Sequence, residues 1–256
     1  MLGNKVSRRR LRAGGEHSSA SKIVSGVRAL ERKRLGIIGG SGPEAGLQLW
    51  KAILDTARER SGSLYRGDVD APYVVIVSDP VLGLSMDLRL HEELVLQHLE
   101  EAVLTVDKNA DVYAIACVTL HCLLPQIERL PLTGTLVSAV DSIVAHAEKH
   151  SLKQLAVITA ETFPREESPL LDRLGESVSV ELPSDPSLVR ALVFDIKRLG
   201  GMHRDVVTRF RRLVDSLTSE TVLLACTDLS LVQTSFDDRR IVDCTELLAE
   251  SLVDLW

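Results

Sequence analysis

Short apolar segments alternate with longer segments of helical spacing over residues 34–256, and this alternation sets the strongest limit on the fold. The strand-like runs occupy residues 35–38, 73–77, 112–116, 135–137, 155–158, 178–182, 222–225 and 241–243. Strands that alternate with helices form parallel sheets covered by helices. The sequence therefore predicts an α/β protein that has enough residues to bury a substantial core.

The two halves of this pattern resemble one another. Each opens with a strand and a polar loop, at residues 39–43 and at residues 159–162, and each later carries a strand that ends in Ala-Cys. We predict two pseudo-symmetric lobes, each a parallel sheet flanked by helices, with the active site in the cleft between them. The first lobe is expected at residues 34–137, completed by residues 226–256, and the second at residues 138–225.

The cysteines of these two strands, Cys117 and Cys226, are the leading candidates for catalysis. Ligands of open α/β sheets bind outside the carboxyl ends of the strands, where both residues are expected. A helix N-terminus stabilises a thiolate there and lowers a thiol pKa that is otherwise about 8.5. Two such thiols indicate a pair that faces one substrate from opposite sides. We interpret Cys122 and Cys244, which lack this context, as structural.

Composition excludes several classes of function. The net charge of −6 and the absence of a nucleic-acid-binding motif argue against a nucleic-acid partner. No apolar run approaches the roughly 20 residues that cross a bilayer. Four cysteines are too few for a disulfide scaffold and favour a reduced, cytoplasmic compartment. Residues 1–33 form a basic Ser/Arg-rich extension that we expect to be disordered, with an organelle transit peptide as the alternative.

Residues 39–44 form a glycine-rich turn between a strand and a helix, an arrangement that suits a carboxylate or phosphate. The turn lacks both common nucleotide-binding patterns, so nucleotide binding is not favoured. The candidate substrate-binding residues of this turn and of the loops near the two thiols are Gly40, Ser41, Gly42, Thr119, His121, Thr162, Thr227 and Asp228. For His121 a capping or core role is an equal alternative. For Asp228 the alternative is that it is only a favourable acidic residue in the first turn of a helix.

Four motifs, residues 35–44, 116–121, 225–228 and 242–245, occur in an order that resembles the aspartate/glutamate racemase family. The resemblance extends from Arg34 to the C-terminus. It implies an enzyme of amino-acid metabolism that inverts an α-carbon without a cofactor or a metal. It also implies that Cys117 and Cys226 are the acid/base pair and that Lys197 lies near an acidic substrate. Homodimers are common in the family, so the resemblance allows a homodimer, although no residue pattern marks an interface.

The sequence departs from this family at two positions. The residue after the first cysteine is usually asparagine in the family but is Val118 here. Aspartate racemases of the family carry an arginine after a Pro-Asp pair, whereas Asp79-Pro80 is followed here by Val81, and Arg89 is the nearest cation. These departures are compatible with racemase chemistry and leave the identity of the amino acid open.

Three alternatives to a racemase remain at this stage. A decarboxylase or isomerase of a small carboxylic acid would use the same fold with a different cleft lining. A metal-binding or redox module would use Cys117, His121, Cys122 and Cys226, but the chain has no C-x-x-C pair to support it. A catalytically silent carboxylate-binding protein would have no need of two opposed thiols.

Overall fold

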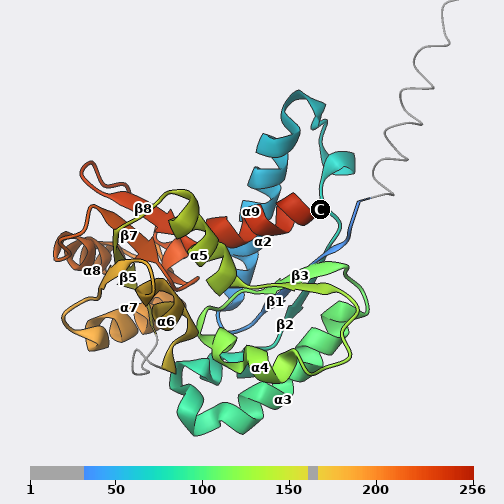
Figure 1. The fold of residues 1–256 in the computed structure, drawn as a ribbon, viewed down its shortest axis with the longest axis horizontal. Helices are drawn as coiled ribbons and strands as arrows, with labels where there is room; N and C mark the ends of the chain where they lie inside the picture. The colour runs from blue at the N-terminus through green and yellow to red at the C-terminus, as the bar shows by residue number, and fades with distance from the viewer. Residues whose placement is uncertain (1–31, 161–166) are drawn as a thin grey trace, which may run out of the picture.

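A computed structural model describes residues 32–160 and 167–256, which form two four-stranded parallel sheets (Figure 1). The strands are β1 (Leu35–Gly39), β2 (Val74–Ser78), β3 (Val112–Ile115), β4 (Thr135–Val137), β5 (Gln154–Ile158), β6 (Ser179–Glu181), β7 (Thr221–Leu224) and β8 (Arg240–Asp243). The order is β2-β1-β3-β4 in the first sheet and β6-β5-β7-β8 in the second. The predicted pair of similar α/β lobes is confirmed.

In both sheets the strands are parallel, and the order in which the chain adds them reverses between the two central strands. The connection from β1 leads to β2 on one side, and β3 connects to β4 on the other; β5 and β7 are related in the same way. Open α/β sheets bind ligands at such a switch, outside the carboxyl ends of the strands. The loops after β1, β3, β5 and β7 are therefore the positions from which side chains reach a shared site.

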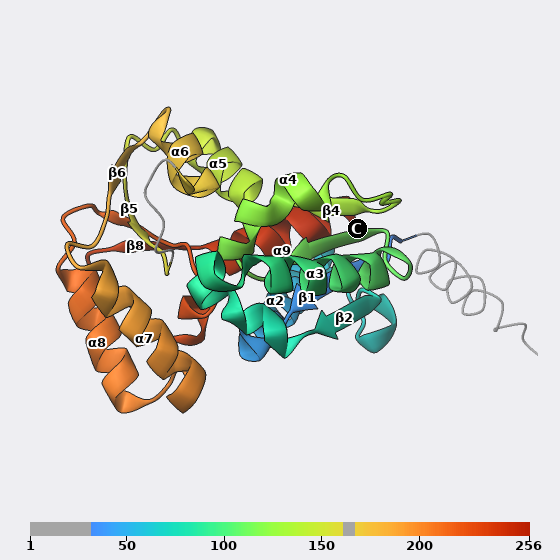
Figure 2. The same ribbon diagram turned by 90° about the horizontal axis from the view of Figure 1, so that it is seen from below.

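Eight helices lie in the described residues and cover these sheets. They are α2 (Pro43–Ser61), α3 (Leu88–Asp107), α4 (Leu124–Ile127), α5 (Ala139–Lys149), α6 (Pro169–Gly175), α7 (Pro186–Leu199), α8 (Arg204–Asp215) and α9 (Cys244–Leu255). Proline at the first helical position begins α2, and the side chains of Ser138, Asp185 and Asp243 cap α5, α7 and α9. Figure 2 shows α5 and α6 on one side of the second sheet and α7 and α8 on the other.

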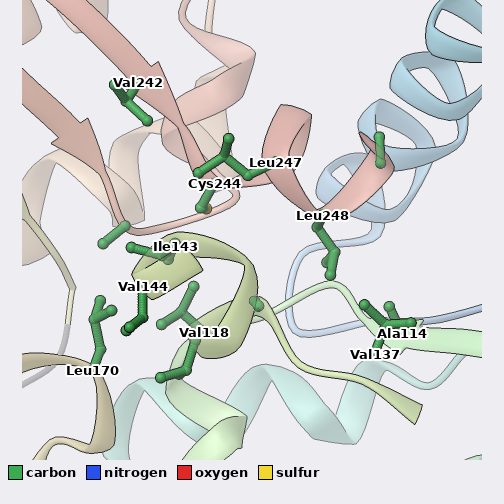
Figure 3. Close-up of a cluster of buried hydrophobic side chains, with 14 of the residues drawn as sticks. Ala114, Val118, Val137, Ile143, Val144, Leu170, Val242, Cys244, Leu247 and Leu248 are labelled. Carbon is green, nitrogen blue, oxygen red and sulfur yellow. The ribbon is translucent and has the colours of Figure 1, made fainter. Parts of the chain in front are cut away.

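Alternating strand residues bury both faces of each sheet. In the first lobe Ile38 and Ile115 pack in the same cluster as α3, whereas Ile37 packs in the cluster that includes α2 and α9. That second cluster continues into the other lobe through α5 and α6, where Val144 and Leu170 lie near Val118 (Figure 3). The lobes consequently share one apolar core, which fixes their loops relative to one another.

The C-terminal segment divides between the lobes, in contrast to the expected boundary that placed residues 226–256 with the first lobe. Strand β8 pairs with β7 and completes the second sheet. Helix α9 packs against α2 of the first lobe and against α5, and crosses between the sheets in Figure 1. The sequence pattern identifies a strand but not its neighbour, because the residues of a short parallel strand do not indicate which strand it pairs with.

Residues 1–31, which include nearly all of the basic extension, lie outside the described residues. Across residues 32–160 and 167–256, no helix is both long enough and apolar enough to cross a membrane. All four cysteines lie within these ranges, and none of them forms a disulfide.

Candidate active site

The loops that carry Cys117 and Cys226 meet between the lobes. The backbone N–H of Ala116 donates to Ile38 O at 2.8 Å, and that of Ala225 donates to Ile158 O at 2.9 Å, so each cysteine follows directly on its sheet. The Thr227 hydroxyl, which is buried, donates to Ala116 O at 2.9 Å. This bond joins the residue before one cysteine to the residue after the other, and it commits the Thr227 hydroxyl to structure rather than to a substrate.

Cys117 lies against the glycine-rich loop of its own lobe. Its Sγ accepts a hydrogen bond from the Ser41 hydroxyl at 3.1 Å, and the Ser41 hydroxyl is 2.7 Å from that of Ser85. Both serines are buried. A hydroxyl that donates to a thiolate favours the ionised form of sulfur. The Ser41 hydroxyl, which the sequence analysis assigned to a substrate, therefore contacts the Cys117 sulfur instead.

Cys226 has the opposite environment. Burial, followed by the charges of Asp228 and Cys117, raises the pKa of the Cys226 thiol. The Asp228 Oδ2 lies 4.0 Å from the Cys226 sulfur. The expected helix N-terminus is absent from the described chain after Cys226, where only a three-residue 3₁₀ turn, η6 (Leu229–Leu231), follows. The expectation of a lowered thiol pKa is therefore wrong for Cys226, whose surroundings favour the protonated thiol.

Lys197 binds both lobes. Its Nζ lies 2.7 Å from the Asp228 Oδ2 and also donates to Ser41 O of the glycine-rich loop. Burial raises the pKa of Asp228, and the Lys197 ammonium acts against that shift. The lysine thus lies beside the glycine-rich loop, and its charge is balanced by Asp228.

Two glycines of the loop are required by close approach. Gly40 has φ of 110°, and a Cβ there would overlap the carbonyl of Asp79. Gly42 has extended backbone, but a Cβ there would overlap the Asp228 carboxylate and lie 3.2 Å from Lys197 Nζ. The loop is therefore shaped to pack against the residues of both lobes that surround the thiols.

His121 is a structural residue in this arrangement. Its Nδ1 is 2.9 Å from Cys117 O, and its Nε2 accepts the Ala139 N–H at 2.9 Å. Since Nε2 accepts, Nδ1 carries the proton and donates to the carbonyl. Burial lowers the pKa of His121 to about 4, so the ring is neutral. His121 holds the backbone of Cys117 in place and has no nitrogen left for a substrate, in contrast to its prediction as a substrate-binding residue.

The other residues that the sequence analysis discussed have different surroundings. Thr119 is partly buried at the start of the 3₁₀ turn η4 (Thr119–Leu123), beside Cys117. Val118 is buried in the shared core. Arg89 pairs with Glu167, which faces it from the other lobe. Thr162 lies outside the described residues. For the metal-module alternative, the described part of the chain contains no group of three or more His, Cys, Asp or Glu side chains that could hold an ion.

Comparison with known proteins identifies the family. A family model described as Asp/Glu/Hydantoin racemase matches residues 38–252. The chain belongs to the Asp/Glu/Hydantoin racemase family. The family resemblance found in the four sequence motifs is thereby confirmed. No curated protein matches the chain with significant similarity.

Solved racemase structures share the fold of this family member. Aspartate racemase from Picrophilus torridus has a TM-score of 0.73 at 17% identity, over 86% of this chain and 93% of that one. An aspartate racemase homologue from Pyrococcus horikoshii OT3 has a TM-score of 0.66 at 21% identity, over 87% and 98%. Glutamate racemase from Francisella tularensis, in complex with D-glutamate, has a TM-score of 0.59 at 12% identity, over 88% and 81%.

Sequence reasoning missed Ser85 and the inter-lobe role of Arg190 in this racemase-family protein. Ser85 lies in the 3₁₀ segment η3 (Pro80–Asp87), 44 residues from Ser41. Arg190 of α7 donates to Met86 O and pairs with Asp87 at 2.6 Å, and it also lies over the Phe194 ring. No sequence signal marks either residue, because each depends on a partner that is distant along the chain.

Asp228→Asn is expected to accelerate alkylation of Cys226 by iodoacetamide about tenfold at neutral pH, the effect of one unit of thiol pKa. The Asp228 charge raises the pKa of Cys226, so its removal lowers that pKa and leaves the Lys197 ammonium to favour the thiolate further. Peptide mass spectrometry would follow the modification of Cys226. Asp237→Asn, which removes an exposed carboxylate, serves as the control. An unchanged or slower reaction in Asp228→Asn would contradict this account of the thiol.

Proposed function

We propose that this protein is a cofactor-independent amino-acid racemase in which Cys117 and Cys226 are the two acid/base groups. The observation that carries the proposal is the Thr227–Ala116 hydrogen bond, which holds the two cysteine loops side by side across the lobes. The effect of the Cys117 charge on the pKa of Cys226 is consistent with that proximity. Family membership and the racemase fold support the same chemistry.

The two thiols have different neighbours, which suit them to different roles in the reaction. Cys117, which accepts the Ser41 hydroxyl, is suited to act first as the thiolate base that removes the α-proton. Cys226, whose pKa is raised, is suited to supply its proton to the opposite face of the α-carbon. One C–H bond breaks and one forms, so the product is the mirror-image amino acid, with Cys117 as thiol and Cys226 as thiolate. The reverse reaction exchanges these roles.

Negative charge develops on the substrate carboxylate as the α-proton leaves. The backbone N–H groups of the glycine-rich loop and the hydroxyl of Thr119 are the groups we assign to that carboxylate, because donors fixed in advance stabilise charge as it forms. The charge of the Lys197 ammonium is balanced by the Asp228 carboxylate, whose Oδ2 lies 2.7 Å from Lys197 Nζ. The relatives named above act on, or were crystallised with, acidic amino acids, so aspartate and glutamate are the first substrates to test.

The test is exchange of the α-hydrogen in D₂O. Purified, reduced protein without added cofactor would be incubated with L- and D-amino acids, beginning with aspartate and glutamate, and followed by NMR and chiral chromatography. We expect deuterium incorporation with inversion for one enantiomeric pair, with loss of inversion in both Cys117→Ala and Cys226→Ala. Cys122→Ala, which removes a thiol outside the site, should retain it. Inversion that survives removal of either catalytic thiol would refute the two-thiol mechanism.

A further inference from the structure

A chain of two buried hydroxyls leads to Cys117. The Ser85 hydroxyl lies 2.7 Å from that of Ser41, and the Ser41 hydroxyl lies 3.1 Å from the Cys117 sulfur. Ser85 is 4% exposed and Ser41 is 6% exposed, so water does not compete freely for these bonds. The two serines come from different loops of the first lobe, the glycine-rich loop and η3.

The direction of these bonds follows from the number of protons. A serine hydroxyl has one proton to donate. When Ser41 donates to a Cys117 thiolate, its oxygen can only accept from Ser85, so the chain runs from Ser85 through Ser41 to sulfur. When Cys117 is a thiol, the chain can reverse, with sulfur donating to Ser41 and Ser41 to Ser85. A hydrogen bond to a charged acceptor is roughly twice as strong as a neutral one, and the thiol is only a weak donor. The chain therefore favours the ionised cysteine.

We propose that Ser85 is a positioning residue that acts through Ser41 to stabilise the Cys117 thiolate. The described contact of the Ser85 hydroxyl is with Ser41, and its effect is to fix the Ser41 proton on Cys117. The catalytic consequence rests on the proposed racemase function, whereas the effect on the thiol does not.

The surroundings hold both hydroxyls in place. Lys197 donates to Ser41 O and so fixes the backbone of one serine from the second lobe. Arg190 donates to Met86 O and pairs with Asp87 at 2.6 Å, and so fixes the segment that carries the other. Contacts from α7 therefore hold each end of the chain, and the alignment of Ser85 with Ser41 depends on the approach of the two lobes.

Other titratable groups also act on this site and must stay unchanged in the test. The Cys226 and Cys244 thiols interact electrostatically with Cys117, and the Lys197–Asp228 pair acts on Cys226. The neutral His121 ring donates to the Cys117 carbonyl. Replacement of Ser85 or Ser41 removes none of these groups, so a change in Cys117 reactivity reports the hydroxyl chain.

The test measures the rate of Cys117 alkylation by iodoacetamide against pH, with peptide mass spectrometry to isolate this cysteine. We expect the pH of half-maximal rate to rise by about one unit in Ser41→Ala and by about half a unit in Ser85→Ala, as loss of a hydrogen bond to a charged group predicts. The double variant should match Ser41→Ala alone, because Ser85 acts only through Ser41. Ser85→Thr keeps a hydroxyl and should retain the wild-type profile. Ser63→Ala, which removes an exposed hydroxyl, should also leave the profile unchanged.

The result that overturns the proposal is an unchanged pH profile in Ser85→Ala, or a shift that adds to that of Ser41→Ala. If Ser85→Ala does not fold, Ser85→Cys keeps a weak donor of similar shape and should give a smaller shift in the same direction. The measurement uses no substrate. Failure of racemisation with a shifted profile would thus refute the enzyme and leave the hydroxyl chain, whereas racemisation with an unshifted profile would refute the chain alone.

Discussion

Acidification from neutral pH to pH 4 is expected to remove about 3 kcal/mol of folding free energy through His121 alone. The unfolded chain protonates this imidazole with a pKa near 6.5, whereas burial lowers the pKa in the folded protein to about 4. Above pH 6.5 both states hold the neutral ring and the contribution to stability is complete. Between pH 6.5 and pH 4 the unfolded state binds a proton that the folded state does not, so stability is lost as the pH falls.

Urea unfolding of the wild type and of His121→Gln at a series of pH values would measure this loss. The glutamine does not titrate but can still accept the Ala139 N–H, and other groups, including the partly buried His146 whose pKa is also lowered, change equally in both proteins. The difference between the two free energies of unfolding should therefore shrink by about 3 kcal/mol between pH 6.5 and pH 4. Parallel pH dependences would show that His121 is not buried as a neutral ring.

The role of His121 shows which of its contacts can be predicted from the sequence and which cannot. His121 follows Cys117 by four residues in the sequence, and a hydrogen bond from its ring to the Cys117 carbonyl fits that spacing. The second partner, the Ala139 N–H, lies 18 residues further on and depends on how η4 packs beneath α5. A local pattern therefore predicts that the histidine lies beside the thiol, but only the tertiary structure shows that both nitrogens are already used.

The strands and the thiols were predictable for a related reason. Apolar runs followed by turn residues mark β1, β3 and β7, and a cysteine at the end of such a run must lie at the carboxyl edge of its sheet. The unequal environments of the two thiols were not predictable. They arise from Ser41 and Ser85 at Cys117 and from Asp228 at Cys226, and apart from Asp228 these neighbours come from loops more than 30 residues away.

Val118→Asn, which introduces the residue that the family usually carries after the first cysteine, is expected to destabilise this protein by about 3 kcal/mol. Val118 is 2% exposed and packs in the shared apolar core, near Val144 and Leu170 (Figure 3). An asparagine there would lose the packing of the valine methyls and bury an amide among apolar side chains. An amide without a partner costs about 1–3 kcal/mol beyond the loss of packing.

Chemical unfolding of a matched series would separate these two costs. Val118→Ala removes packing without adding a polar group and should cost about 2 kcal/mol, whereas Val118→Thr keeps the shape and adds only a hydroxyl. We expect Val118→Asn to be less stable than Val118→Ala. If the asparagine variant were the more stable of the two, its amide would have found a polar partner. The expected order instead means that this position faces the core, so that the proposed racemase has no amide at the position where the family resemblance leads us to expect one.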